Sequence, residues 1–213
     1  MKKIFALFAF AISLVNTISA QESKDSTNFS IRLNPSRLFE GTFALSYEHT
    51  LCKDWTLDIT ALGTYGTKRG IGGLYFESQF ASDFSGNYYS ADMISGWGIM
   101  AMPKYFLISK RNLTGAYAAP YAMFRRVSLT GQTYTWEGEP STVTRNVNIY
   151  SVGVTLGGKI ALFKYYCIDF YVGGAFRLAK YDNDKGVTQF KQWTALDYSG
   201  VLPSAGISIG ILK

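Results

Sequence analysis

The sequence predicts an all-β fold, an eight-stranded antiparallel up-and-down transmembrane β-barrel, and three observations lead to it. Apolar and polar residues alternate with a period of two over most of the chain, which is typical of strands whose two faces meet different surroundings. Eight such stretches are joined by connections that alternate between short and long. After the N-terminal region, no apolar run reaches the roughly 18 residues that a membrane helix needs.

The N-terminus has the features of a secretory signal peptide. Lys2 and Lys3 give a basic start, an apolar stretch follows through Val15, and Ala20 is a small residue at a plausible cleavage point. Removing it leaves 213 − 20 = 193 residues, the size of one domain. The predicted division is a signal peptide at 1–20, a short polar linker at 21–27 and the barrel domain at 28–213.

The strands are expected, in chain order, at 28–34, 42–51, 55–65, 96–108, 115–127, 147–161, 167–179 and 202–212. The second of them shows the pattern well. Its large apolar face is followed in the sequence by a face of small or charged residues, and the two sets are Phe43, Leu45 and Tyr47 against Ala44, Ser46 and Glu48. Pro103 lies inside the fourth strand and cannot donate a ladder hydrogen bond, so a β-bulge is expected there.

The connections indicate how the barrel would sit in a membrane. Short links are expected at 52–54, 109–114 and 162–166, and long polar ones at 66–95, 128–146 and 180–201. The link at 35–41 is short but lies on the long-loop side. Outer-membrane barrels have short turns in the periplasm and long loops outside, so both chain ends are expected in the periplasm.

The face of small and charged residues suits the narrow interior of an eight-stranded barrel. Unpaired charges there would be costly, so we expect an ion-pair network. Its members are Arg32, Glu48, Asp58, Lys104, Lys159, Asp169 and Arg177. The aliphatic and aromatic face would then contact lipid. Aromatic residues near strand ends, where interfacial girdles form, are Trp55, Tyr65, Trp97, Tyr105 and Tyr117.

Several kinds of chemistry are not expected. Gly153, Gly158 and Lys159 match the spacing of a phosphate-binding loop, but Ile160 stands where such a loop has Ser or Thr, and the flanks alternate as strands. The exported chain would carry a mild charge of +4, since the signal peptide removes two lysines from +6. We therefore expect no nucleotide, no nucleic acid, no cofactor and no metal.

Enzymatic activity is not expected either. Some small outer-membrane barrels modify lipid A with a His, a Ser and a carboxylate. His49 is the one histidine of the chain, and its parity places it on the lipid face, opposite to that of Glu48. Cys52 and Cys167 are expected in turns on opposite sides of the barrel, too far apart for a disulfide.

The long loops are the remaining functional candidates. Aromatic side chains among small polar residues make adaptable contact surfaces. The candidate contact residues are Tyr75, Phe76, Phe80, Tyr88, Tyr89, Tyr134 and Trp136. Membrane lipid is the expected partner of the wall, and an extracellular ligand or protein is a possible partner of the loops.

Several segments together resemble a family of small outer-membrane β-barrels from Bacteroides-type bacteria, catalogued as a domain of unknown function. They are 31-IRLNPSRLFEGTFALSYEH-49, 103-PKYFL-107, 115-GAYAAPY-121, 157-GGKIALFKYYCIDFYVGGAFR-177 and 205-AGISIG-210. The architecture is similar to that of OmpA-like and OmpX-like barrels. The resemblance covers nearly the whole exported chain, and it implies a barrel in the outer membrane but no active-site residues.

The favoured function is a structural or surface-interaction protein of the outer membrane. Two alternatives remain open. A lipid-modifying barrel enzyme would need His49, and a soluble periplasmic lipocalin-like carrier would place the apolar face inside, around its ligand. An apolar exterior argues against the second, because it would aggregate in water.

Overall fold

The computed structural model describes residues 28–52, 54–67, 81–82, 88–111, 113–134, 141–163, 165–182, 184–185 and 198–213. The expected signal peptide and linker lie outside this part of the chain. The strands are β1 (Phe29–Leu33), β2 (Thr42–Cys52), β3 (Trp55–Thr67), β4 (Ala81–Ser82), β5 (Tyr88–Arg111), β6 (Thr114–Tyr134), β7 (Ser141–Leu162), β8 (Tyr166–Tyr181), β9 (Asp184–Lys185) and β10 (Gly200–Leu212). A 3-10 helix, η1 (Pro35–Glu40), follows β1.

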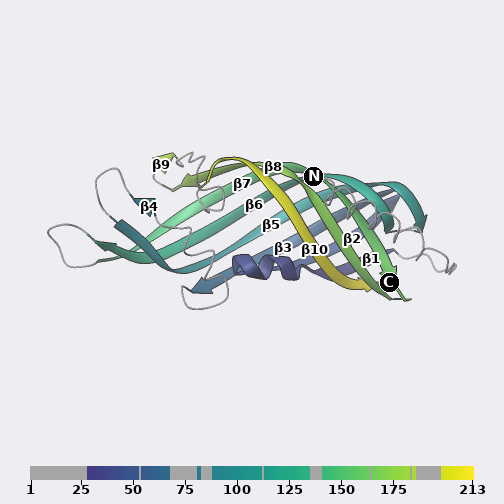
Figure 1. Ribbon diagram of the computed structural model, residues 1–213, viewed down its shortest axis with the longest axis horizontal. Coiled ribbons are helices and arrows are strands. Elements are labelled where there is room, and N and C mark those ends of the chain that lie inside the picture. Colours follow the sequence, from purple (N-terminus) through teal and green to yellow (C-terminus); the bar gives the residue numbers. More distant parts are fainter. Residues whose placement is uncertain are drawn as a thin grey trace, which may run out of the picture.

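Eight of these strands form a closed antiparallel ring, which confirms the predicted fold class. The ring follows the chain order, with β1 paired to both β2 and β10. The two-residue strands β4 and β9 extend β5 and β8 at one end of the molecule (Figure 1). That end, which carries the long connections, is called the upper end below, and the end with the short turns and the termini of the barrel is the lower end.

The register fixes the width of the barrel. A path drawn across the strands from Gly200 returns to β10 at Gly210, ten residues further along, the difference between 210 and 200. A stagger of this kind goes with strands tilted by roughly 35–45°. Eight strands at this tilt leave an interior that side chains can fill. The strands accordingly run obliquely around the barrel (Figure 1).

Side chains alternate between the two faces of the wall as expected for β2, β3, β7 and β8. In β2, for example, Ala44, Ser46 and Glu48 are buried inside, whereas Phe43 and Leu45 are exposed outside. The exposed residues make an apolar outer surface and the buried ones a polar and charged core. The wall is therefore arranged as the sequence predicts.

The strands on one side are taller than predicted. Residues 88–95 of β5, expected in a loop, are strand, and most of the expected loop 128–146 belongs to β6 and β7. These extensions alternate too, but their outer face is polar: Ser128 donates to Asn146 Oδ1 (2.6 Å), and Thr130 and Thr144 share a hydrogen bond (3.1 Å). Polar outer residues had been taken for loop because a lipid-facing strand would not carry them.

Both cysteines are free, with Cys52 exposed and Cys167 buried. Among the residues that the structure describes, no helix is long and apolar enough to cross a membrane.

Candidate functional site

Six buried charged side chains meet in the lower half of the interior. They form the charged cluster, made of Arg32, Glu48, Asp58, Lys104, Lys159 and Asp169. The six come from β1, β2, β3, β5, β7 and β8. Because each strand points alternate residues inward, one inward charge at the same depth on each strand is enough to assemble the cluster.

Each acid in the charged cluster has more than one partner. Glu48 pairs with Arg32 (2.9 Å), Lys104 (3.2 Å) and Lys159. Lys104 also contacts Asp58 (3.1 Å) and Asp169 (2.8 Å). Arg32 pairs with both of these aspartates. Three cations and three anions balance, so the cluster as a whole is neutral.

Hydroxyl groups complete the hydrogen bonding of the charged cluster. Thr56 donates to Glu48 Oε1 (2.8 Å), and Tyr117 donates to Asp169 Oδ1 (2.7 Å). The ring of Tyr117 also faces Lys104, whose Nζ lies 4.6 Å from the ring centroid. A buried ion network is tolerated when its lone pairs and protons are all used in this way. Together these side chains fill the lower interior.

Two residues depart from the predicted network. Arg177 has the inward parity of Asp169 but lies eight residues higher on β8, roughly 26 Å along the strand, so it is not part of the charged cluster. Arg125, which sequence reasoning missed, is buried higher up, where it donates to Thr42 (2.6 Å) and Thr64 (2.7 Å). Parity gives the face of a strand but not the depth.

Tyr117 is a correction to the predicted aromatic girdle, because it lies inside and is only 1% exposed. The cause is that β6 reverses the rule seen elsewhere. Its inward residues are large, as with Tyr117 and Tyr121, while Ala118, Pro120 and Ala122 face outward. A rule based on residue size therefore fails on this strand, although period two holds.

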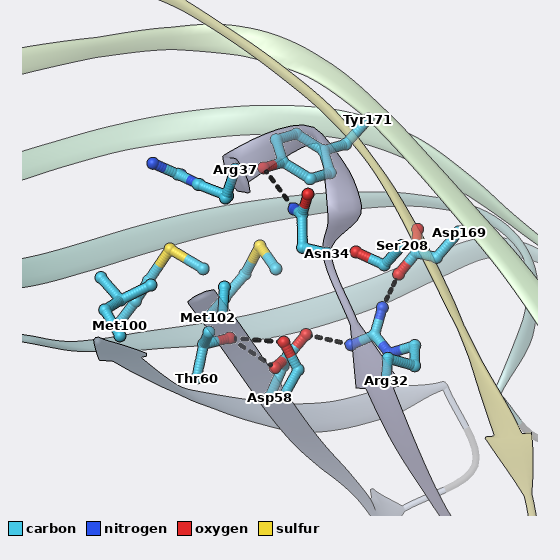
Figure 2. Close-up of a pocket in the computed structure, with 13 residues that line it drawn as sticks. Arg32, Asn34, Arg37, Asp58, Thr60, Met100, Met102, Asp169, Tyr171 and Ser208 are labelled. Atoms are coloured by element: carbon cyan, nitrogen blue, oxygen red, sulfur yellow. Dashed lines mark hydrogen bonds and ion pairs between the residues drawn. The ribbon is translucent and has the colours of Figure 1, made fainter. Parts of the chain in front are cut away.

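A second polar and apolar region lies above the charged cluster, at mid-height. We call it the methionine pocket, and its lining includes Asn34, Arg37, Ala44, Leu62, Met100, Met102, Tyr171 and Ser208, with Arg32, Asp58 and Asp169 of the charged cluster at its floor. Figure 2 shows Met100 and Met102 side by side on one flank, and Tyr171 on the other, bonded to Asn34 Nδ2 (3.2 Å). The free space between these groups is about 310 Å³ including its mouth, and it is narrow.

The outer wall carries a continuous apolar band. Examples from β7 are Val152, Val154 and Leu156, each more than half exposed. Aromatic contacts occur at two levels. The upper level includes the pairs Trp97–Phe124 (5.6 Å between ring centroids) and Phe124–Tyr150 (5.2 Å), and the lower level includes Trp55–Tyr105 (5.1 Å). Just above the upper level the outer face becomes charged, with Arg126 paired to Asp182 (3.0 Å).

His49 lies on the outer face, as its parity predicts, and stacks near Tyr47 with 6.4 Å between ring centroids. Glu48 faces the opposite way, into the charged cluster. Lys159, the lysine of the phosphate-loop spacing, lies on a strand and belongs to the charged cluster. Among the described residues, no three of His, Cys, Asp and Glu are placed to hold a metal ion.

The candidate contact residues divide into two groups. Tyr75, Phe76, Phe80 and Trp136 lie outside the described residues. The others belong to strands and not to loops: Tyr88 and Tyr134 are opposite each other at the upper ends of β5 and β6, and Tyr89 is opposite Ala81 of β4. The ladder therefore gathers these three positions at the upper tip of the tall wall.

A family model described as "Protein of unknown function (DUF3575)" matches residues 6–210. The chain belongs to the DUF3575 family. The family has no assigned function, in agreement with the resemblance seen in the sequence. Among solved structures, the chain is similar to CarO of Acinetobacter baumannii, with 9% sequence identity, a TM-score of 0.45, and coverage of 91% of this chain and 100% of that chain. No curated protein matches. At this level of similarity, no property of CarO is carried over to the DUF3575 protein.

Proposed function

We propose that this DUF3575 protein is an outer-membrane β-barrel with a filled interior, whose tall upper wall makes contacts at the cell surface. The observation that carries the proposal is the apolar band between two aromatic levels, wrapped around the neutral charged cluster. Lipid-facing bands of this kind are flanked by aromatic girdles in outer-membrane barrels. A soluble carrier would expose the opposite face, because its apolar residues would line the ligand cavity.

The charged cluster supports a closed barrel over an open pore. In the lower half, side chains from six strands meet at hydrogen-bonding distance, with Lys104 within 3.2 Å of an oxygen of all three acids. A porin needs a wider barrel to leave an aqueous channel. The upper wall supports a surface role. Above Arg126 the outer faces of β6 and β7 are polar, so this part of the wall is suited to water.

Membrane location is tested by cell fractionation and by gel mobility in SDS with and without boiling. We expect the protein in the outer membrane, with a mobility that changes on boiling. Protein that stays monodisperse in the periplasm without detergent would instead support the soluble carrier. In planar bilayers, the purified barrel should give no sustained ion conductance.

Surface exposure is tested with single cysteines in a Cys52→Ser background. Thr130→Cys, on the polar upper wall, should react with a membrane-impermeant maleimide on intact cells. The matched position Val154→Cys, in the apolar band, should react only after solubilisation. Equal labelling of both on intact cells would contradict the proposed depth. The lipid-modifying alternative is tested separately, since it requires His49→Ala to change the lipid A profile.

A further inference from the structure

The ring of strands has a seam where β1 ends early. β1 pairs with β10 over four residue pairs, from Ser30↔Leu212 to Leu33↔Ile209. Asn34 N–H still bonds to Ala44 O of β2 (3.1 Å), and then the chain leaves the sheet as η1. β10 continues up to Gly200, and among the described residues no strand pairs with its 200–208 stretch on this side. We call this place, with η1 lying against 200–208, the seam (Figure 1).

Two prolines keep the seam from being hydrogen-bonded as a ladder. Lys213 and Phe29 exchange backbone hydrogen bonds in both directions (3.0 Å each), so the odd-numbered residues of β10 direct their N–H groups toward the seam. Pro203 stands at one of these positions and has no N–H. Pro35 stands where β1 would have donated to Ile207. Prolines are confined to strand edges for this reason.

The seam is held by few bonds. Ile207 N–H donates to Ser36 Oγ (3.3 Å), and Ser36 in turn donates to Asn34 Oδ1 (2.5 Å). Tyr171 Oη accepts from Asn34, and Arg37 pairs with Glu40 (3.4 Å). η1 itself contributes no buried residue. Segments with few buried contacts are those that open at the lowest free energy.

The outer side of the seam faces lipid. Phe43 on β2 and Ile207 on β10 flank it and belong to the exposed apolar band, and Val201 is 73% exposed. η1 adds Phe39, which is 79% exposed, and Leu38. Irregular backbone at membrane depth is tolerated only where it lines protein or a cavity. The molecules that reach the seam from this side are therefore the acyl chains of the membrane itself.

The inner side of the seam opens on the methionine pocket. Asn34 and Arg37 next to η1, and Ser208 on β10, line the pocket from the two edges of the seam. The far flank is formed by Met100 and Met102. Methionine side chains are flexible and adapt to apolar ligands. With η1 in place the pocket has room for about one water molecule, so a larger guest requires η1 and the methionines to move outward.

We propose that the seam is a lateral access route through which one acyl chain of a membrane lipid enters the methionine pocket, with η1 as the strap that opens. The lipid headgroup stays outside, at the level of the upper aromatic residues. The charged cluster forms the floor, so the chain cannot pass further down. This inference rests on the proposed membrane location.

The test uses purified barrel in vesicles of phosphatidylethanolamine and phosphatidylglycerol that contain a phospholipid with a diazirine at the end of one acyl chain. After irradiation, cross-linked peptides are identified by mass spectrometry. We expect adducts on the inward residues Met100 or Met102 as well as on the outer band, for example Val154. Ser36→Ala, which removes the bond to β10, should raise the inward adducts at least about twofold, the change expected from losing a fraction of one hydrogen bond.

Ala44→Leu fills the pocket from β2 and should abolish the inward adducts while leaving those on Val154 unchanged. Its fold is checked by the boiling-dependent gel shift, and Leu62→Met serves as a milder second variant with the same expectation of fewer inward adducts. Adducts on the outer band alone, in both the natural protein and Ser36→Ala, would overturn the proposal and leave the membrane location intact. Absence of adducts on the outer band as well would instead contradict the membrane location.

Discussion

The charged cluster and the methionine pocket lie one above the other in the same barrel, yet they differ in their wall and in their filling. Around the charged cluster every strand is paired on both sides, and each acid has several partners. Around the methionine pocket the wall is interrupted by the seam, and the side chains are mostly apolar or neutral. Arg37 is the exception, and it pairs with Glu40.

This difference shows where a narrow barrel can keep buried charge. A buried ion is stable only if protein groups replace its water on all sides, and a complete ring of strands can supply such groups from every direction. Next to the seam one of these directions is lipid, which supplies none. Uncharged, flexible side chains are the residues that can border an opening without a large desolvation cost.

The largest expected effect comes from breaking the charged cluster. Asp169→Ala removes the acceptor of Lys104 and Tyr117 and one partner of Arg32, and it leaves an excess buried positive charge. Removing one partner of a buried pair costs about 3–5 kcal/mol of stability. Denaturant titration in detergent micelles measures this loss. Asp182→Ala, on the exposed pair with Arg126, is the control and should cost at most about 1 kcal/mol.

A smaller effect is expected from placing a donor in the seam. Pro203→Ala adds an N–H directed toward the seam, where no strand pairs with β10 among the described residues. An unsatisfied buried donor costs about 1–3 kcal/mol. The free energy of unfolding should fall by that amount. A stability equal to that of the natural protein would mean that η1 provides an acceptor, and the contrast between seam and complete wall would be weaker than stated.

Two tyrosines compare the regions through a single hydroxyl group each. Tyr117→Phe removes a hydrogen bond to an ionised acid of the charged cluster, which is worth about 1.5–3 kcal/mol. Tyr171→Phe removes a neutral bond to Asn34 beside the seam, worth about 0.5–1.5 kcal/mol. Thermal unfolding followed by the gel shift ranks the two. Reversal of this order would show that the seam is held more firmly than the charged cluster.

The smallest effect is expected at a second proline site, in the complete wall. Pro103 and Pro120 face each other between β5 and β6, where the ladder is interrupted from Ala101↔Ala122 to Tyr105↔Ala118 without a change of register. In Pro103→Ala the new N–H points at the carbonyl of Pro120, a gain of about 1 kcal/mol that the added freedom of the unfolded chain offsets by about 0.4–1 kcal/mol. Stability should stay nearly unchanged, in contrast to Pro203→Ala.

Period-two alternation was sufficient to predict the barrel and the inward face of most strands. It also identified the six side chains that form the charged cluster, because charges on an otherwise apolar strand have to face the interior. The expected bulge at Pro103 is absent: the strand keeps its register there, and the nearest shift lies between Phe106 and Ile108. A facing proline on β6 explains this, since neither strand has to insert a residue to avoid an unpaired donor.

Other features depend on information that alternation does not carry. Depth along a strand is set by the stagger of the whole ring, so Arg177 was assigned to the wrong level and Arg125 was missed. Tyr117 was assigned to lipid because it lies near a strand end, although β6 turns its large residues inward. The seam could have been suspected from Pro35 and Pro203, but their opposition across the ring depends on the register of β1 and β10.

The short pairing of β1 with β10 has a consequence for the order of folding. Ser30 and Leu212 are 182 positions apart in the chain, the difference between 212 and 30, and all other strand neighbours in the ring are consecutive hairpins. The entropy of closing so long a loop is lost before this pairing can form, so it is expected late, after the hairpins. Substitutions in β1 should therefore speed unfolding and leave the folding rate almost unchanged, the behaviour of a contact absent from the transition state.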